Sequence, residues 1–180
     1  VRAKTFQYVA AKSKKIDYDN IRLESVSDSI NATMDMRDYN LNLVGVKNFV
    51  LSDTNFVVVF PRQNQLTLKE DRSMDFSGQM FAGRLDLSGD GFTFDYNNFK
   101  IDLSKVDSVV INIPAGQRDA SGNQTVGPIK SVISDVTGNL QIDTKDNRSG
   151  NKHHVQYPIL NTTQPSYVFY DNSKILGGVY

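Results

Sequence analysis

Residues 74–113 contain a series of short runs in which apolar residues occupy every second position. Side chains on a strand point alternately to its two faces, so this period of two is typical of half-buried strands. Gly, Asp and Asn separate the runs and favour turns between them. The alternating apolar residues are Leu85 and Leu87, then Phe92, Phe94 and Tyr96, then Phe99, Ile101 and Leu103, and finally Val109, Ile111 and Ile113.

The composition of the chain favours the same fold class. The chain of 180 residues has only two glutamates, Glu24 and Glu70, among its 20 acidic residues. It is rich in β-branched and aromatic residues, which fit a pleated sheet, and in Asp and Asn, which disfavour helix interiors. We therefore expect an all-β, antiparallel fold, either an elongated curved sheet or a β-sandwich, with long polar loops. Residues 1–180 are predicted to form one domain cut from a larger protein, with residues 1–15 as a flank that could be strand or helical turns.

Several strand ends can be predicted from the turn residues. We expect hairpin turns near Asp90-Gly91 and Asn97-Asn98, and an exposed turn at residues 69–72. Residues 55–60 form a continuous apolar run, which predicts a strand covered on both faces and ended by Pro61. Strands are expected again within residues 132–143, and residues 167–170 form a final apolar stretch. The predicted inward-facing residues are Leu41, Leu43, Phe56, Val58, Phe60, Phe76, Leu85, Leu87, Phe92, Phe94, Phe99, Ile101, Val109 and Ile111.

The charges exclude some partners. The 20 basic and 20 acidic residues cancel, so there is no basic footprint of the kind that nucleic-acid binding needs. The chain has no cysteine, which excludes disulfides and thiolate metal sites, and no apolar run approaches the roughly 18 residues of a membrane span. One local cluster is either a patch for anionic lipid or polysaccharide or, by preference, a solvated flank. It consists of Arg2, Lys4, Lys12, Lys14 and Lys15.

No group of residues has the pattern of a known catalytic or metal site, so we predict no cofactor, no metal and no catalytic residue. Asp86, Asp90 and Asp95 lack the spacing of a calcium loop. The only histidines, His153 and His154, are adjacent and would face opposite ways on an extended chain, so an exposed loop is the expected setting. Asp143 and Asp146 could bind a metal ion together with these histidines only if the loop folded so as to bring them together. The chain has no Trp, the residue that most often stacks on sugars, which weakens a sugar-binding interpretation. The remaining candidates for stacking are Tyr8, Tyr18, Tyr39, Tyr157, Tyr167 and Tyr170.

Two polar segments are the candidate binding loops. Residues 115–128 follow Pro114, which is predicted to end the last clean strand, and residues 144–154 form the second segment. Function on a β framework usually lies on loops, but the preferred interpretation of both segments is that they are spacers facing solvent. Their residues without an evident packing role are Arg118, Asp119, Asn123, Lys145, Asp146, Arg148, Lys152, His153 and His154.

A weak internal similarity is open to two interpretations. The sequence LNLVG at residues 41–45 returns as LDLSG at 85–89, and Asn55-Phe56 returns as Asn98-Phe99. Stacked layers of one elongated sheet would produce such a repeat, and so would chance in a chain rich in strands.

The spacing of glycines and aromatics also suggests a family. Phe76-x-Gly78, Ala82-Gly83 and Gly89, followed by F-x-F-x-Y at 92–96 and F-x-I-x-L at 99–103, resemble the β-rich repeats of large AsmA/TamB-type bacterial envelope proteins. The resemblance covers residues 41–113. It implies stacked short strands in a long curled sheet between the membranes, with an apolar groove for lipid passage or envelope maintenance. The polar segments after Pro114 depart from that pattern, and no site residue is transferred.

The predicted function is a non-catalytic structural or binding module of a large bacterial cell-envelope or surface protein. Its location would be the periplasm or the cell surface, with the cytoplasm left open, and its partners other domains of the parent chain, lipid or polysaccharide. The alternative is a carbohydrate-active or other hydrolytic domain that uses a pair of Asp residues. A cleft with two facing carboxylates would favour the enzyme, whereas an apolar groove or a filled core would favour the module.

Overall fold

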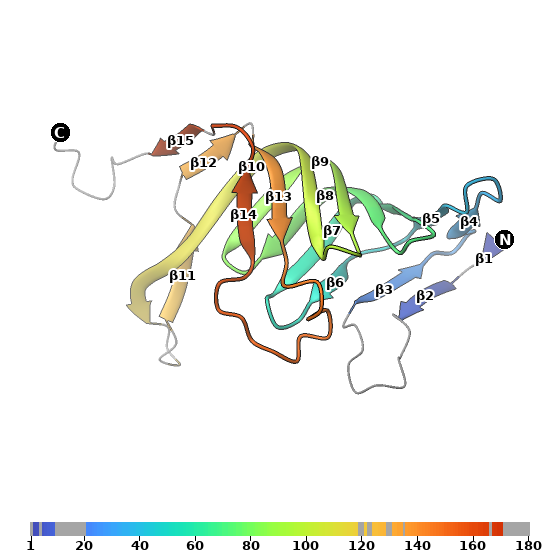
Figure 1. Ribbon diagram of the computed structural model, residues 1–180, viewed down its shortest axis with the longest axis horizontal. Coiled ribbons are helices and arrows are strands. Elements are labelled where there is room, and N and C mark those ends of the chain that lie inside the picture. The colour runs from blue at the N-terminus through green and yellow to red at the C-terminus, as the bar shows by residue number, and fades with distance from the viewer. Residues whose placement is uncertain are drawn as a thin grey trace.

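The structure is a computed structural model that describes residues 2–3, 5–9, 21–118, 121, 124–128, 131–134, 136–165 and 167–170, with the side chains of residues 21–112, 121 and 136–165. The described residues contain strands and no helix. All strands belong to one antiparallel sheet that is curled but open, which confirms the all-β antiparallel prediction. Figure 1 shows β1 and β15 at opposite ends of the long axis of the molecule.

The strands differ greatly in length, and the longest lie at the centre of the sheet. In chain order they are β1 (Arg2–Ala3), β2 (Thr5–Val9), β3 (Arg22–Val26), β4 (Ala32–Met34), β5 (Leu41–Val44), β6 (Phe49–Ser52), β7 (Val57–Leu68), β8 (Met74–Ala82), β9 (Leu85–Asp95), β10 (Lys100–Arg118), β11 (Gln124–Pro128), β12 (Ser131–Ser134), β13 (Val136–Gln141), β14 (Ile159–Thr162) and β15 (Tyr167–Tyr170).

Four long strands, β7 to β10, form the centre of the sheet, and short strands share each of its two edges. On the β7 edge, β6 pairs with the first part of β7 and β5 with its last part, so the sheet branches there. On the β10 edge, β13, β12 and β11 pair with successive parts of β10. The branching lets the sheet curl around its own inner face (Figure 1).

The inner face holds one continuous apolar core. Strand β8 alternates buried and more exposed residues, with Met74, Phe76 and Met80 pointing inward. Phe76 meets the ring of Phe49 edge-on at a centroid distance of 5.4 Å and that of Phe92 at 5.7 Å. Burial of each such side chain stabilises the fold by about 1.5–3 kcal/mol. The core is therefore filled with side chains.

Most of the predicted inward-facing residues are buried, but one strand has the opposite phase. Val57 and Val59 of β7 are buried, whereas Val58 is half-buried, Phe60 is exposed and Phe56 lies in the preceding turn. The prediction was wrong because residues 56–60 are all apolar, so the sequence does not show which of them face inward. The predicted residues that are buried are Leu41, Leu43, Phe76, Leu87, Phe92, Phe94, Phe99, Ile101 and Val109, while Leu85 and Ile111 are half-buried.

Proline does not end the two strands that it was predicted to end. Strand β7 continues through Pro61, which lies where the pairing with β6 has ended and that with β5 has not begun. Strand β10 continues through Pro114 to Arg118. The amide of Asn112 points toward β9, since it donates to Arg84 O at 2.8 Å. Backbone nitrogens of alternate strand residues point to the same side, so the nitrogen of Pro114 also points that way, where β9 has already ended. Both prolines thus occupy positions where a missing N–H breaks no ladder.

The turn predictions have mixed outcomes. The turn near Asn97-Asn98 is confirmed, since it joins β9 to β10, and the turn at residues 69–72 joins β7 to β8. The turn at Asp90-Gly91 was wrong: both residues lie within β9, and the chain reverses at Gly83-Arg84 instead. Gly91 has a φ of 65°, and an Asp-Gly pair serves a bulge with a left-handed glycine as well as a hairpin turn.

The remaining assignments concern the two ends of the chain and the internal similarity. Residues 2–3 and 5–9 are strands, the strands expected within 132–143 are present, and the apolar stretch at 167–170 is a strand as well. Lys4, Lys12, Lys14 and Lys15 lie outside the described residues, as does the side chain of Arg2. Phe56 and Phe99 both end hairpin turns with a φ of 53°, but β5 is a short strand between β4 and the last part of β7, whereas β9 is a long central strand. The similarity therefore reflects shared turn geometry within unlike surroundings.

Candidate functional site

Residues 142–158 form an irregular segment that leaves β13 and returns as β14. Three successive turns shape it, with backbone amides donating from Asn147 to Thr144 O at 3.0 Å, from Gly150 to Asn147 O at 2.9 Å and from Tyr157 to His154 O at 3.1 Å. In Figure 1 this segment, drawn in orange, passes close to the turn between β6 and β7. Hydrogen bonds between the two confirm that contact.

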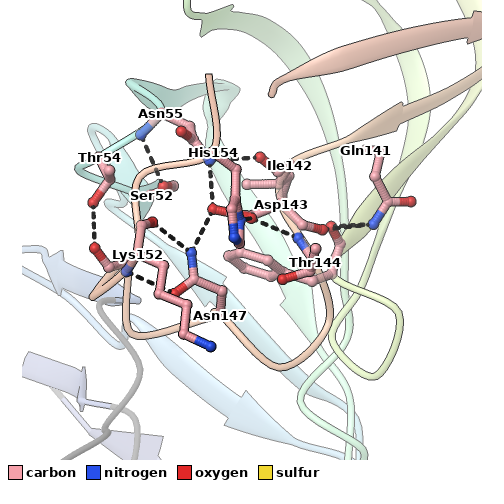
Figure 2. A network of polar contacts seen from close by, with 12 residues as sticks. Ser52, Thr54, Asn55, Gln141, Ile142, Asp143, Thr144, Asn147, Lys152 and His154 are labelled. Carbon is pink, nitrogen blue, oxygen red and sulfur yellow. Dashed lines mark hydrogen bonds and ion pairs between the residues drawn. The ribbon is translucent and has the colours of Figure 1, made fainter. Parts of the chain in front are cut away.

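A buried carboxylate fastens the segment to the sheet (Figure 2). Asp143 has an exposed fraction of 0%. Its Oδ2 accepts hydrogen bonds from Asn55 Nδ2 and Asn147 Nδ2, each at 2.8 Å. Its Oδ1 accepts from the backbone amide of Thr144 and contacts His154 Nδ1, each at 2.7 Å. Four partners therefore compensate the desolvation of one carboxylate, as a buried charge requires.

The same network joins segments that are far apart in the sequence. Asn55 lies in the turn between β6 and β7, and its Nδ2 also donates to Ile142 O at 2.9 Å. Thr54, from the same turn, donates to Gly150 O at 3.0 Å. Asn147 closes the other end of the segment, because its Nδ2 donates to Lys152 O at 2.8 Å and its Oδ1 accepts from Lys152 N at 3.1 Å.

The pairing of Asp143 with His154 has the form of a catalytic dyad but not its surroundings. A dyad of this kind orients the imidazole so that its other nitrogen can activate a hydroxyl. Among the described residues, the contacts of His154 are Asp143 and the edge of the Tyr157 ring, at a centroid distance of 6.2 Å. The role that this geometry supports is attachment of the segment.

A pocket of about 760 Å³ lies beside the network. Its walls come from the β6–β7 turn, the β8–β9 turn and residues 153–158. Two large apolar side chains at its border are strongly exposed, Phe56 at 72% and Val155 at 82%. The lining residues are Thr54, Asn55, Phe56, Ala82, Gly83, Arg84, Leu85, His153, Val155, Gln156, Tyr157 and Pro158.

The polar groups of the pocket are unevenly satisfied. Asn55 is buried, with an exposed fraction of 3%, and its Nδ2 is held by two acceptors, so its amide orientation is fixed. Its Oδ1 is buried without a hydrogen-bond partner. Arg84 is exposed, and no described side chain pairs with its guanidinium. The lining includes no Asp or Glu.

The segment beside the pocket carries several charged residues, one of which is Asp146. The pKa of Asp146 is lowered, first by the hydrogen bond from the Thr144 side chain and further by the nearby positive charges of Lys152 and His154. Asp146 therefore stays ionised at neutral pH and offsets only part of the basic charge contributed by Lys145, Arg148 and Lys152 in the same segment.

A second hollow, of about 320 Å³, lies on the outer face over β5, β7, β8 and β9. Its polar side chains already bond to each other or to neighbours. Thr67 Oγ1 donates to Asn42 Oδ1 at 2.8 Å, and Asp75 pairs with Lys69 at 2.8 Å. The pocket beside Asn55 is the better candidate, because it is larger and has two exposed apolar side chains at its border.

The structure changes the assignment of the predicted binding residues. Residues 144–154 are irregular as predicted, but residues 115–118 and 124–128 of the other predicted loop belong to the paired strands β10 and β11. Arg118 belongs to β10, while Asp119 and Asn123 lie outside the described residues. Apart from Ala115, Val126 and Pro128, residues 115–118 and 124–128 are polar or glycine, so the sequence of these strands has no apolar period of two.

Two residues expected to be free of packing roles have one. His154 is half-buried against Asp143, so the expectation of an exposed position holds for His153 alone. The guanidinium of Arg148 lies over the ring of Tyr96 at 4.7 Å. Lys145, Asp146 and Lys152 lie on the same segment but do not line the pocket. Of the binding residues predicted in this segment, the pocket lining includes only His153.

Other candidate residues separate in space. Asp86 accepts from Gln79, Asp90 pairs with Arg62 and Asp95 accepts from Asn98, so these carboxylates have different partners. Among the tyrosine candidates, Tyr157 lines the pocket and Tyr39 lies elsewhere, at the turn between β4 and β5. The side chains of Tyr8, Tyr18, Tyr167 and Tyr170 are outside the described set.

Comparison with family models, with curated proteins and with solved structures finds no match to this chain. Within the described residues, no three His, Asp or Glu side chains are grouped so that they could hold a metal ion. The described part of the chain also has no helix of the length and apolarity needed to cross a membrane.

Proposed function

We propose that this chain is a non-catalytic binding module of a larger bacterial cell-envelope or surface protein, and that its ligand occupies the pocket between the β6–β7 turn, the β8–β9 turn and residues 153–158. The observation that carries the proposal is the exposure of Phe56 and Val155 over a pocket whose backbone is already held in place. Large apolar side chains exposed beside a polar site are typical of ligand-binding surfaces.

The walls of the pocket support binding more than hydrolysis. A hydrolase of the Asp-pair type needs two carboxylates on opposite sides of the scissile bond. The pocket lining contains no Asp or Glu, and Asp143 behind it is fully occupied by its four partners. The filled core of the sheet supports a module that presents its ligand site on turns attached to a rigid framework.

The proposal can be tested by NMR titration of the ¹⁵N-labelled chain with a library of small aromatic and polar fragments. We expect shift changes in residues 54–56, 83–85 and 153–158 for at least some fragments. Phe56→Ser should weaken these effects, whereas the matched control Phe60→Ser, which removes an exposed phenylalanine from the outer face, should not. A library that perturbs other surfaces, or none, would contradict the proposal.

A further inference from the structure

Strand β14 lies at an open edge of the sheet. It pairs with β13, and within the part of the chain that the structure describes no strand pairs with its other side. The amide of Thr163 donates to Thr137 O at 2.8 Å, so the backbone of Asn161, two residues earlier, also points toward β13. The N–H and C=O groups of Leu160 and Thr162, which alternate with these residues, therefore point away from the sheet.

The sequence leaves this edge open to pairing. Proteins usually block an exposed edge with lysines, prolines or bulges, because a row of unpaired backbone groups readily pairs with another strand. Residues 155–170 are the longest run of the chain without Asp, Glu, Lys or Arg. Residues 1–15, which include β1 and β2, carry five basic residues by contrast. Pro158 and Pro165 flank β14, so the open edge is limited to the residues between them.

An edge of this kind selects its partner by the chemistry of the backbone. Donors and acceptors spaced along an extended strand are matched by the backbone of another strand. Antiparallel pairing of β14 with its own copy is self-complementary, since Leu160 of each copy then lies opposite Thr162 of the other and Asn161 lies on the two-fold axis. This register brings no like charges together, because β14 and the residues beside it are uncharged.

We infer that β14 joins two copies of this chain edge to edge, so that one sheet continues from β13 of one copy through both β14 strands to β13 of the other. Leu160 and Thr162 form two hydrogen-bonded pairs across the axis, each with two N–H···O bonds. The inference goes beyond the proposed function, because the contact uses residues 159–164 and none of the residues that line the pocket.

The test is sedimentation velocity of the whole chain at increasing concentration. We expect a monomer–dimer equilibrium with a dissociation constant between about 10 μM and 1 mM, because a small interface gives low affinity. Thr162→Pro removes an N–H that points away from β13, and should raise the dissociation constant at least about tenfold by deleting two hydrogen bonds of the dimer. The matched control Thr162→Val keeps that N–H and should change the constant by less than about threefold.

A pair of charge variants tests the register without relying on proline. Asn161→Lys places like charges opposite each other at the two-fold axis and should weaken the dimer at least about threefold at low ionic strength. Mixing Asn161→Lys with Asn161→Asp should restore association, because opposite charges then face each other. Protection of the Asn161 and Thr163 amides against hydrogen exchange, compared with the parent, shows that β14 stays paired with β13 in each variant.

Two results would overturn the inference. A parent chain that remains monomeric up to about 1 mM would leave this edge to a strand of another protein. A dimer that tolerates both Thr162→Pro, with β14 still in place, and like charges at position 161 would be held by another surface. Neither result bears on the pocket, because the fragment titration is read from residues 54–56, 83–85 and 153–158.

Discussion

The central strands and the segment 142–158 are held in place by opposite means. In β7 to β10, many apolar side chains each contribute a moderate share, and neighbouring ladders reinforce one another. In the segment, one carboxylate collects four polar partners, and three local turns, the hydrogen bond from Thr54 to Gly150 O and the contact of Arg148 with the Tyr96 ring add to its order. Stability is distributed over the sheet and concentrated at a single residue in the segment.

This difference separates the framework from the proposed site. A sheet with distributed stability tolerates changes on its surface, whereas a segment held by a few polar contacts centred on Asp143 can be released without unfolding the rest. The pocket takes one wall from each region, because the turns 53–56 and 83–84 belong to the sheet and residues 153–158 to the segment. Its shape therefore depends on the contact between Asn55 and Asp143.

The largest expected effect is in the sheet. Phe92→Ala removes a fully buried ring that packs against Phe76 at 5.7 Å and should lower the free energy of unfolding by about 3–5 kcal/mol. The whole chain should unfold at a lower urea concentration in one transition, as followed by far-ultraviolet circular dichroism. Phe81→Ala, on the outer face, is the control and should cost much less. Similar losses for both variants would show that the inner face is not the main source of stability.

A glycine of the sheet comes next. Gly78 has a φ of 138°, and an added Cβ would lie 2.3 Å from Phe60 O and 2.7 Å from Arg62 N, both backbone atoms. Gly78→Ala should therefore destabilise the chain by about 2–3 kcal/mol through backbone strain and steric overlap. Gly91→Ala should cost less, because its Cβ would meet only the Ser104 side chain, at 3.6 Å. Equal denaturation midpoints for the two variants would contradict this account of the β7–β8 contact.

A smaller effect concerns pH and the β9–β10 turn. Burial opposes ionisation of Asp95, but hydrogen bonds from the side chain and amide of Asn98 outweigh it and lower the pKa of Asp95. A lowered pKa stabilises the folded state above the unfolded value of about 4, and this contribution is lost as the pH falls through the folded value. Urea midpoints at pH 7 and pH 3 should therefore differ less in Asp95→Asn than in the parent chain. An unchanged difference would exclude this carboxylate as a contributor.

The sequence predicted the regular region far better than the site. In β8 to β10 the period of two identified inward residues such as Phe76 and Phe94, because one face is apolar and the other polar. In the run at 55–60 both faces are apolar, so Phe56 was assigned to the core although it borders the pocket. Pro61 and Asp90-Gly91 predict strand ends, but each lies beside an irregularity within a continuous strand, since the same residue types occur at both.

The fastening of the segment could not be predicted from local patterns. Asp143 and Asn55 are 88 residues apart and meet only when the sheet has curled. His154 was considered with Asp143 as a metal ligand, and nothing in the spacing indicated a direct pairing. Arg84 lies in the turn at Gly83 that joins β8 to β9. Its position in the pocket lining with Phe56 could not be predicted, because the sequence does not show at which of several glycines the chain reverses.

The most direct test of the account is amide hydrogen exchange in Asp143→Asn, with Asp146→Asn as the control that neutralises an exposed carboxylate of the same segment. We predict faster exchange of Asn55, Asn147, Gly150 and Tyr157 in Asp143→Asn, because a neutral amide cannot accept from all four donors at once. Protection in β8 to β10 should stay at the parent level, and the control should match the parent throughout. Unchanged protection in the segment, or loss of protection across β8 to β10 as well, would contradict the claim that one buried carboxylate fastens the segment to an independently stable sheet.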